Sequence, residues 1–250
     1  MSSVEENREG RVALAVAFRT LEKLGLHEGV DNHLSLMVPA ARGVGQVMLI
    51  NPYGLHWSEI TASSLVGVNK EGKVVEGEGQ PDKAATAVHL GLRQVRPDTP
   101  CIMHTHMPYA TALGMLEDPR IKLYHQNASR LYGIVAYDAD YQGIPSATEE
   151  GRRLGELLGD NEVMIMQNHG ALTIGNTVAM AFDLMYSLER ACMFQVILAY
   201  STGRPLREFP ESVAKQRREN FPPELDSFYA DIHFKAMKRK VIRETPDVLK

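Results

Sequence analysis

Apolar and polar positions recur along the chain with two periods, one helical and one extended. Apolar spacing of three and four residues predicts helices over 11–24, 84–95, 108–116, 148–158, 178–200 and 225–242. Short alternating or continuous apolar runs predict strands over 32–38, 46–50, 65–68, 73–75, 101–106, 133–136 and 163–167. Residues 69–72 (Asn-Lys-Glu-Gly) separate two of these strands and are typical of a hairpin turn.

The order of these elements predicts the fold class. Helices and strands interleave without strict alternation, and the hairpin comes early, so we expect an α/β domain whose central sheet is at least partly antiparallel, with helices on both faces. Beyond residue 202 the apolar pattern weakens and prolines accumulate. We expect this tail to form an oligomer arm rather than a second domain.

Composition narrows the function classes. The 27 basic and 31 acidic side chains give a net charge of −4, which provides no general attraction for nucleic acid or an anionic membrane. The polar first residues, together with the absence of any apolar run approaching the roughly 18 residues of a membrane span, predict a cytoplasmic protein. Cys101 and Cys192 stand in apolar runs and predict buried thiols, without a CxxC metal motif.

The strongest candidate for chemistry is His104-Thr105-His106, at the end of an apolar strand. Residues i and i+2 of a strand point to the same face, so both imidazoles can bind one ion. A second apolar strand, 163–167, runs directly into Asn168-His169-Gly170. Three histidines at the ends of neighbouring strands would leave a divalent ion with open positions, as in a catalytic site. The structural alternative is hydrogen-bonded histidines that bind no ion.

Other polar residues carry weaker signals. His89, on the predicted helix 84–95, is interpreted as a packing histidine. His125 lies in a polar stretch and either faces the cleft or lies on the surface. Tyr141 is a candidate proton donor from a loop, and the turn Asn51-Pro52-Tyr53-Gly54 is of a kind that binds oxyanions when it lines a cleft.

Taken together, these motifs resemble the class II aldolase/adducin head-domain family from about residue 11 to residue 203. The resemblance is carried by Asp31-Asn32-His33-Leu34-Ser35, Ile50-Asn51-Pro52-Tyr53-Gly54, residues 59–66, Val88-His89, Arg96-Pro97-Asp98, His104-Thr105-His106, Tyr141-Gln142-Gly143 and Asn168-His169-Gly170. It implies a three-layer αβα sandwich with a mostly antiparallel central sheet over residues 1–203, followed by the tail 204–250. It also implies a homotetramer with sites between subunits.

The resemblance assigns a divalent metal to His104, His106 and His169, and we expect Zn²⁺ ahead of Mn²⁺ or Fe²⁺. The sugar-phosphate aldolases carry Ser-Ser-Glu before the helix histidine, where this chain has Lys83-Ala84-Ala85. The carboxylate and the phosphate-binding hydroxyls are therefore missing. Proton transfer is assigned instead to Asp82, Tyr141 or His125. Substrate binding is assigned to Asn32, Asn51 and Gly54, and to Lys83 as the partner of a substrate carboxylate.

These features predict a metal-dependent carbon–carbon lyase, of aldolase or decarboxylase type. Its substrate would be a small unphosphorylated hydroxy or keto acid, or an aldehyde. One alternative is an Fe²⁺-dependent oxidative decarboxylase or oxygenase, because three histidines without a carboxylate leave more open positions on iron. The other is a non-catalytic, adducin-like interaction module, which the missing glutamate favours and the three histidines oppose.

Overall fold

The computed structural model describes residues 2–42, 45–139, 147–201, 203 and 205–250. Its strands are β1 (His33–Pro39), β2 (Gln46–Ile50), β3 (Val66–Val68), β4 (Val74–Glu76), β5 (Cys101–Thr105), β6 (Val135–Asp138), β7 (Val163–Met166) and β8 (Gly170–Gly175). Its α-helices are α1 (Ser3–Lys23), α2 (Lys83–Val95), α3 (Pro108–Gly114), α4 (Gln126–Arg130), α5 (Ala147–Leu158), α6 (Val178–Ser201), α7 (Glu211–Asn220) and α8 (Pro223–Glu244). Two short 3₁₀ helices are η1 (Trp57–Glu59) and η2 (Pro246–Leu249).

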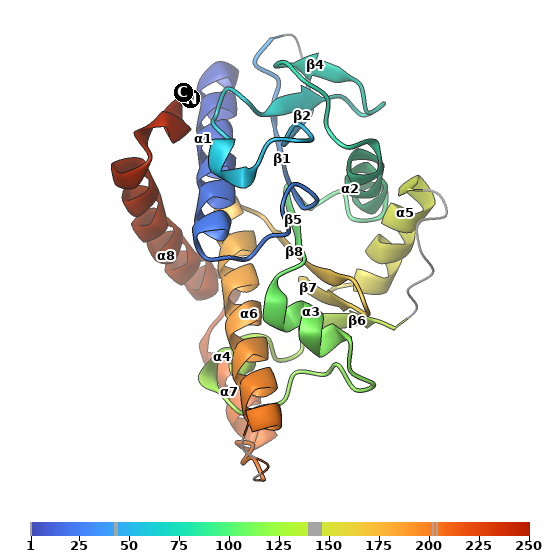
Figure 1. Ribbon diagram of the computed structural model, residues 1–250, viewed down its shortest axis with the longest axis vertical. Coiled ribbons are helices and arrows are strands. Elements are labelled where there is room, and N and C mark those ends of the chain that lie inside the picture. The colour runs from blue at the N-terminus through green and yellow to red at the C-terminus, as the bar shows by residue number, and fades with distance from the viewer. Residues whose placement is uncertain (1, 43–44, 140–146, 202, 204) are drawn as a thin grey trace.

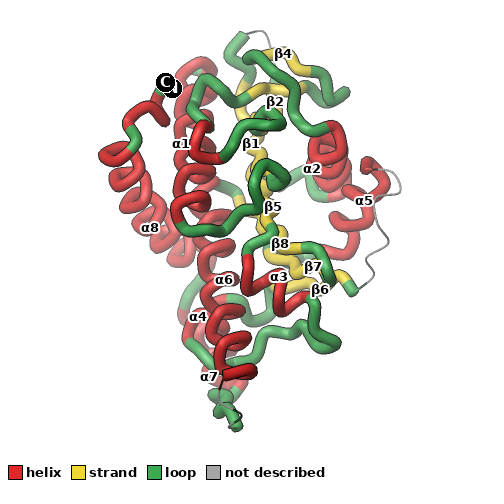
Figure 2. The backbone as a smooth tube through the Cα atoms, in the orientation of Figure 1, coloured by secondary structure: helices red, strands yellow, loops and turns green. Residues whose placement is uncertain are grey.

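The described strands form a single sheet in the order β4-β3-β2-β1-β5-β8-β7-β6. Every neighbouring pair is antiparallel except β6 and β7. Helices cover both faces, with α2 and α5 on one side and α1 and α6 on the other (Figures 1 and 2). The predicted three-layer αβα sandwich with a mostly antiparallel sheet is therefore confirmed.

Each sheet face carries its own apolar core, because side chains of a strand alternate between the two faces. In β5, Cys101 and Met103 belong to the larger core beneath α1, α3 and α6. Ile102 belongs to a smaller core together with Leu92 of α2 and Leu154 of α5. His104 continues the Ile102 side of the strand and therefore faces α2 and α5.

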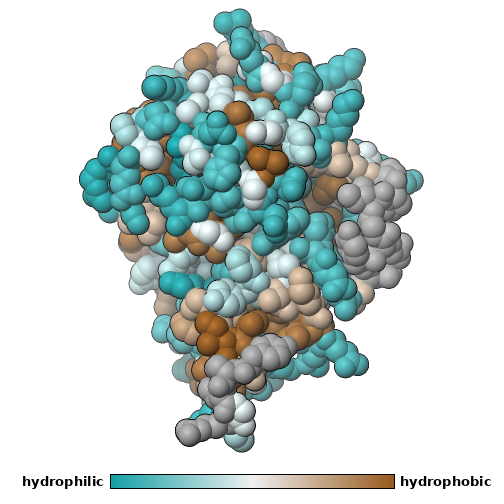
Figure 3. All heavy atoms as spheres, viewed as in Figure 1, coloured by the Kyte–Doolittle hydropathy of each residue, from teal (hydrophilic) through white to brown (hydrophobic). Residues whose placement is uncertain are grey.

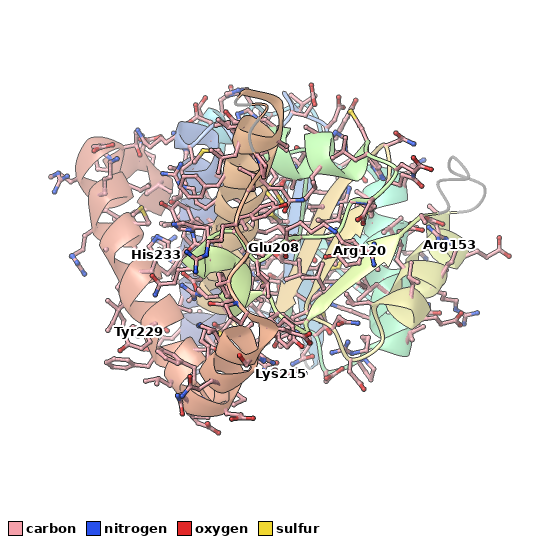
Figure 4. The ribbon with its side chains drawn as sticks, turned by 90° about the horizontal axis from the view of Figure 1, so that it is seen from below. Arg120, Arg153, Glu208, Lys215, Tyr229 and His233 are labelled. Carbon is pink, nitrogen blue, oxygen red and sulfur yellow. The ribbon has the colours of Figure 1, made fainter. Side chains whose placement is uncertain are left out.

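The C-terminal segment packs on the same chain. Seen from below, α8 forms a further layer outside α1 and α6, on the side away from the sheet (Figure 4). Phe234 and Val241 of α8 are buried in the larger core. His233 is hydrogen-bonded to the buried Asp183 of α6, with 2.7 Å between Nδ1 and the carboxylate. That the tail 204–250 is also an oligomer arm stays a prediction.

Several boundaries differ from those expected. The first helix begins at Ser3 rather than residue 11, because Ser2 and Glu5 form a capping box. The last helix is longer than 225–242 at both ends. The sequence pattern missed β8, α4 and α7 altogether. The hairpin of β3 and β4 is confirmed, with Gly72 in the left-handed region at φ 76°.

Candidate metal centre

His104 and His106 stand where β5 leaves the sheet. The backbone register places His104 opposite His33 of β1 and opposite Leu172 of β8. His104 is buried, and its Nδ1 lies 3.0 Å from the carbonyl oxygen of Ala171. A carbonyl oxygen only accepts, so Nδ1 carries the proton and Nε2 has a lone pair. This is the tautomer that a metal ligand needs.

His169 reaches the same point from the turn between β7 and β8. Asn168 makes this turn possible by adopting a left-handed conformation at φ 54°, which asparagine tolerates. Gly170 then brings the turn close to β5. A Cβ on Gly170 would lie 2.6 Å from the Thr105 carbonyl oxygen and 2.8 Å from the His106 ring. Only glycine fits here, so the sequence interpretation that Gly170 removes bulk beside His169 is correct.

The three imidazoles converge on a common point. Their ring centroids are 4.9 to 5.1 Å apart, and one ligand nitrogen of each lies within 4.8 Å of the others. The Nε2 atoms of His104 and His106 are 3.2 Å apart. Two ligands at about 2.0–2.1 Å from a tetrahedral zinc are separated by roughly 3.3 Å, so this spacing fits one ion. A trio of histidines is thus positioned to bind a divalent metal.

Burial disfavours the protonated form of all three imidazoles. Burial lowers the pKa of His104 well below its usual range, with further lowering from the neighbouring histidines. Burial also lowers the pKa of His106 and of His169. Because only the neutral ring has a lone pair to give, these shifts leave the nitrogens available to a cation at neutral pH.

The trio opens into a cavity of about 310 Å³ between the sheet, α2 and α5. Asn32 and Asn51, both predicted to bind substrate, lie in its wall and are buried. Asn32 Nδ2 and Asn51 Oδ1 have no hydrogen-bond partner among the residues that the structure describes. Buried polar atoms are rarely left unpaired, so these two are suited to hydrogen-bond a ligand in the cavity.

Asp82 also lines the cavity and caps α2, with its Oδ1 accepting a hydrogen bond of 2.7 Å from the Ala85 backbone N–H. Three other predicted residues lie elsewhere. Lys83 is exposed outside the cavity wall, because the first turn of α2 directs it away, while Ala84 and Ala85 face inward. Gly54 forms a turn at φ 91°, and its neighbour Tyr53 lines the cavity instead.

His125 is the third predicted residue that the structure does not bring to the site. It caps the short helix α4, its ring packs against Phe194 with centroids 4.3 Å apart, and it is absent from the cavity wall. Tyr141 lies outside the described residues.

Other polar residues that the sequence interpretation did not assign to the site also line the cavity, among them two histidines and a glutamate. His33 and His89 lie in the wall, with 2.7 Å between His33 Nδ1 and His89 Nε2. His89 Nδ1 is 2.5 Å from Ser35 Oγ. Burial lowers the pKa of His33 to about 4 and that of His89 well below its usual range. Glu150 of α5 also lines the cavity, with both carboxylate oxygens bound by Arg153.

Comparison with known proteins identifies the family. Residues 12–196 match the family model of the class II aldolase and adducin N-terminal domain. The chain belongs to this family. An aldolase II superfamily protein from Pseudomonas syringae has 32% identity and a TM-score of 0.86, with 98% of this chain and 96% of that chain covered. An L-fuculose 1-phosphate aldolase from Glaciozyma antarctica PI12 has 26% identity and a TM-score of 0.83, with 98% and 94% covered.

Members of this class II aldolase and adducin family also appear among curated relatives. A Pseudomonas aeruginosa protein named provisionally as a class 2 aldolase is 34% identical, over 84% of this chain and 78% of its own length. Alpha-adducin from Rattus norvegicus is 33% identical over 78% of this chain, which spans only 26% of that protein.

No helix in the described part of the chain is long and apolar enough to cross a membrane.

Proposed function

We propose that the chain is a divalent-metal-dependent carbon–carbon lyase, of aldolase or decarboxylase type, acting on a small unphosphorylated hydroxy or keto compound. The single observation that carries the proposal is the convergence of His104, His106 and His169 in the wall of a cavity. A purely structural role does not require three imidazoles whose ring nitrogens converge on one point. A divalent ion held by these histidines would supply a Lewis acid to polarise a substrate carbonyl, and the imidazole set suits Zn²⁺, with Mn²⁺ and Fe²⁺ as alternatives.

The cavity wall supports an unphosphorylated substrate. Asp31, Asp82 and Glu150 line it, and none of the described lining residues is a lysine or arginine. Phosphate binding in proteins relies on cationic side chains, hydroxyls or clustered backbone N–H groups. An uncharged hydroxy aldehyde fits this wall better than a phosphate ester. The exposed Lys83 gives no support for a carboxylate-bearing substrate.

The chain's own residues supply binding and proton transfer in this proposal. Asn32 Nδ2 donates a hydrogen bond to a substrate oxygen, and Asn51 Oδ1 accepts one from a substrate hydroxyl. Asp82 accepts the proton of the hydroxyl on the carbon that becomes the new carbonyl. The carbon–carbon bond next to that carbon then breaks, its electron pair passes to the substrate's own carbonyl group to give an enolate, and Asp82 returns the proton to the enolate carbon. Its Oδ1 is engaged by Ala85 N–H, which leaves Oδ2 for that proton.

The test measures metal content and cleavage together. The protein is loaded with Zn²⁺, Mn²⁺ or Fe²⁺, and neutral, acidic and phosphorylated hydroxy-carbonyl compounds are screened for carbon–carbon cleavage, with oxygen consumption recorded in parallel. We expect about one metal ion per chain and cleavage of unphosphorylated compounds only. His104→Ala should abolish both, whereas the matched histidine variant His125→Ala should retain both.

Two results would overturn the proposal. A wild-type protein that binds no metal after reconstitution would favour the adducin-like interaction module. Oxygen uptake that depends on Fe²⁺ and accompanies substrate loss would favour the oxygenase alternative.

A further inference from the structure

Ser35, His89 and His33 form a hydrogen-bonded chain that leads from the protein interior to the cavity. Ser35 and His33 lie two residues apart on β1 and therefore point to the same face of the sheet, toward His89 of α2. Ser35 Oγ is 2.5 Å from His89 Nδ1, and His89 Nε2 is 2.7 Å from His33 Nδ1. His33 lies beside the proposed metal centre, with its ring centroid 4.9 Å from that of His104. The inference below rests on the function proposed for that centre.

The buried Ser35 hydroxyl determines which group donates in each of these two hydrogen bonds. Ser35 is fully buried, and in the described part of the chain His89 is the one side-chain partner of its Oγ. If His89 donated to Ser35, the hydroxyl proton would be buried without an acceptor, which is costly. Ser35 therefore donates to His89 Nδ1. An imidazole that accepts a hydrogen bond at Nδ1 carries its proton on Nε2, so His89 donates from Nε2 to His33 Nδ1.

The tautomer of His33 follows. Its Nδ1 accepts from His89 Nε2, and a ring that accepts at Nδ1 carries its proton on Nε2. His33 lines the cavity, and its ring centroid is 4.9 Å from that of His104. No described residue is hydrogen-bonded to Nε2. Ala85 lies in the same cavity wall.

We propose that His33, fixed as the Nε2–H tautomer by Ser35 and His89, donates a hydrogen bond to the substrate oxygen that gains negative charge during cleavage. Ser35 and His89 are positioning residues. A protonated Nε2 cannot bind a metal, so His33 is a hydrogen-bond donor rather than a fourth ligand. A neutral histidine held in this way stabilises developing charge without first having to lose or gain a proton.

The first experiment reads the tautomer directly and needs no substrate. Solid-state NMR of protein labelled with ¹⁵N-histidine, metal-free and zinc-loaded, distinguishes protonated from unprotonated ring nitrogens, and His33→Gln assigns the signals of His33. We expect an unprotonated Nδ1 and a protonated Nε2 on His33, with a coupling across the hydrogen bond to His89. A protonated Nδ1 on His33 would overturn the inference even if the protein bound metal as proposed.

The second experiment measures how much the proposed His33 donor contributes to the binding affinity of acetohydroxamate, a small anion that chelates bound metal. Calorimetry on zinc-loaded protein compares wild type with His33→Gln, whose amide retains an N–H donor, and with His33→Leu, which has none. We expect His33→Gln to bind within about 3-fold of wild type and His33→Leu roughly 10-fold more weakly, with zinc content unchanged. Ser35→Ala should weaken acetohydroxamate binding less than His33→Leu does, and it should disturb the NMR signal that reports the His33 tautomer.

Equal affinity for the Gln and Leu variants would contradict the donor role. Loss of zinc from folded His33→Leu would show instead that His33 is a metal ligand, which also contradicts it. A wild-type protein that binds no zinc would remove the proposed function, and the tautomer measured on metal-free protein would still decide whether His33 presents a donor.

Discussion

Gly91 of α2 and Gly151 of α5 lie against each other where the two helices cross over the sheet. A Cβ on Gly91 would lie 2.5 Å from the Thr148 carbonyl oxygen and 3.1 Å from the Gly151 Cα. Both helices contribute to the cavity, with His89 from α2 and Glu150 from α5. Because glycine has no side chain at either position, the two helices can approach closely, and this distance sets the width of the cavity.

Gly151→Ala should therefore separate the helices. Its Cβ would overlap the Val88 carbonyl oxygen, a backbone atom that cannot rotate away. We expect a loss of about 1–3 kcal/mol in the free energy of unfolding, measured by urea denaturation. Glu156→Ala, on the exposed face of the same helix, should change stability by less than about 0.5 kcal/mol. Equal effects from the two variants would contradict this account of the helix crossing.

Stability should fall as the solution becomes acidic, because the buried histidines resist protonation. Below about pH 6.5 the unfolded chain binds protons at these residues, whereas folded His33 binds one only near its pKa of about 4. The free energy of unfolding should drop by about 1.4 kcal/mol per pH unit for each such histidine in this window. Urea denaturation between pH 7 and pH 5 measures the slope.

His33→Gln should make that slope shallower by the contribution of one histidine. His125→Gln, which removes an exposed histidine outside the cavity, is the matched control. A metal-free protein whose stability did not change between pH 7 and pH 5 would contradict the prediction.

The two roles of Asp82 can be separated by substitution. Asp82→Asn retains an oxygen for the N-cap of α2, so the fold should keep its stability while cleavage activity falls at least 100-fold. Asp82→Ala should lose the same activity and also about 1 kcal/mol of stability. Thermal denaturation and turnover of the same preparations test both. Full activity in Asp82→Asn would remove Asp82 from proton transfer.

Assembly into a homotetramer is a further prediction. The lower part of the face seen in Figure 3, over α3 and the C-terminal half of α6, is more apolar than the face above it. Met115 after α3 and Ile197 of α6 are among the exposed large apolar side chains. Light scattering should give four times the 27.8 kDa chain mass. A monomer mass at micromolar concentration would contradict this.

Local patterns were sufficient to predict much of the fold and the metal trio. Period-two alternation located His104 and His106 on one strand face, and Gly170 marked a close approach. The strand β8 was missed because it follows β7 across a turn of only three residues, so the apolar run of 163–175 shows one interruption rather than a loop. The sequence pattern did locate His169 at the end of that turn.

The wider site depended on contacts that no local pattern contains. His33 and Ser35 look like the polar side of a half-exposed strand, but α2, about fifty residues later, covers them and inserts His89. His125 was placed in the proton-transfer set by its polar neighbours alone, and the fold carries it to the cap of α4. Lys83 is the first residue of α2 and lies just outside the face that points into the cavity, because the helix begins at the Asp82 cap.

The acidic lining of the cavity has a kinetic consequence. A phosphate tail gives an enzyme a distant anchor whose binding energy can be used to orient the reacting carbons. A substrate bound only through its reacting oxygens has no such distant anchor, so the Michaelis constant should be high. Adding a negatively charged tail to the substrate should lower the turnover rate rather than raise it.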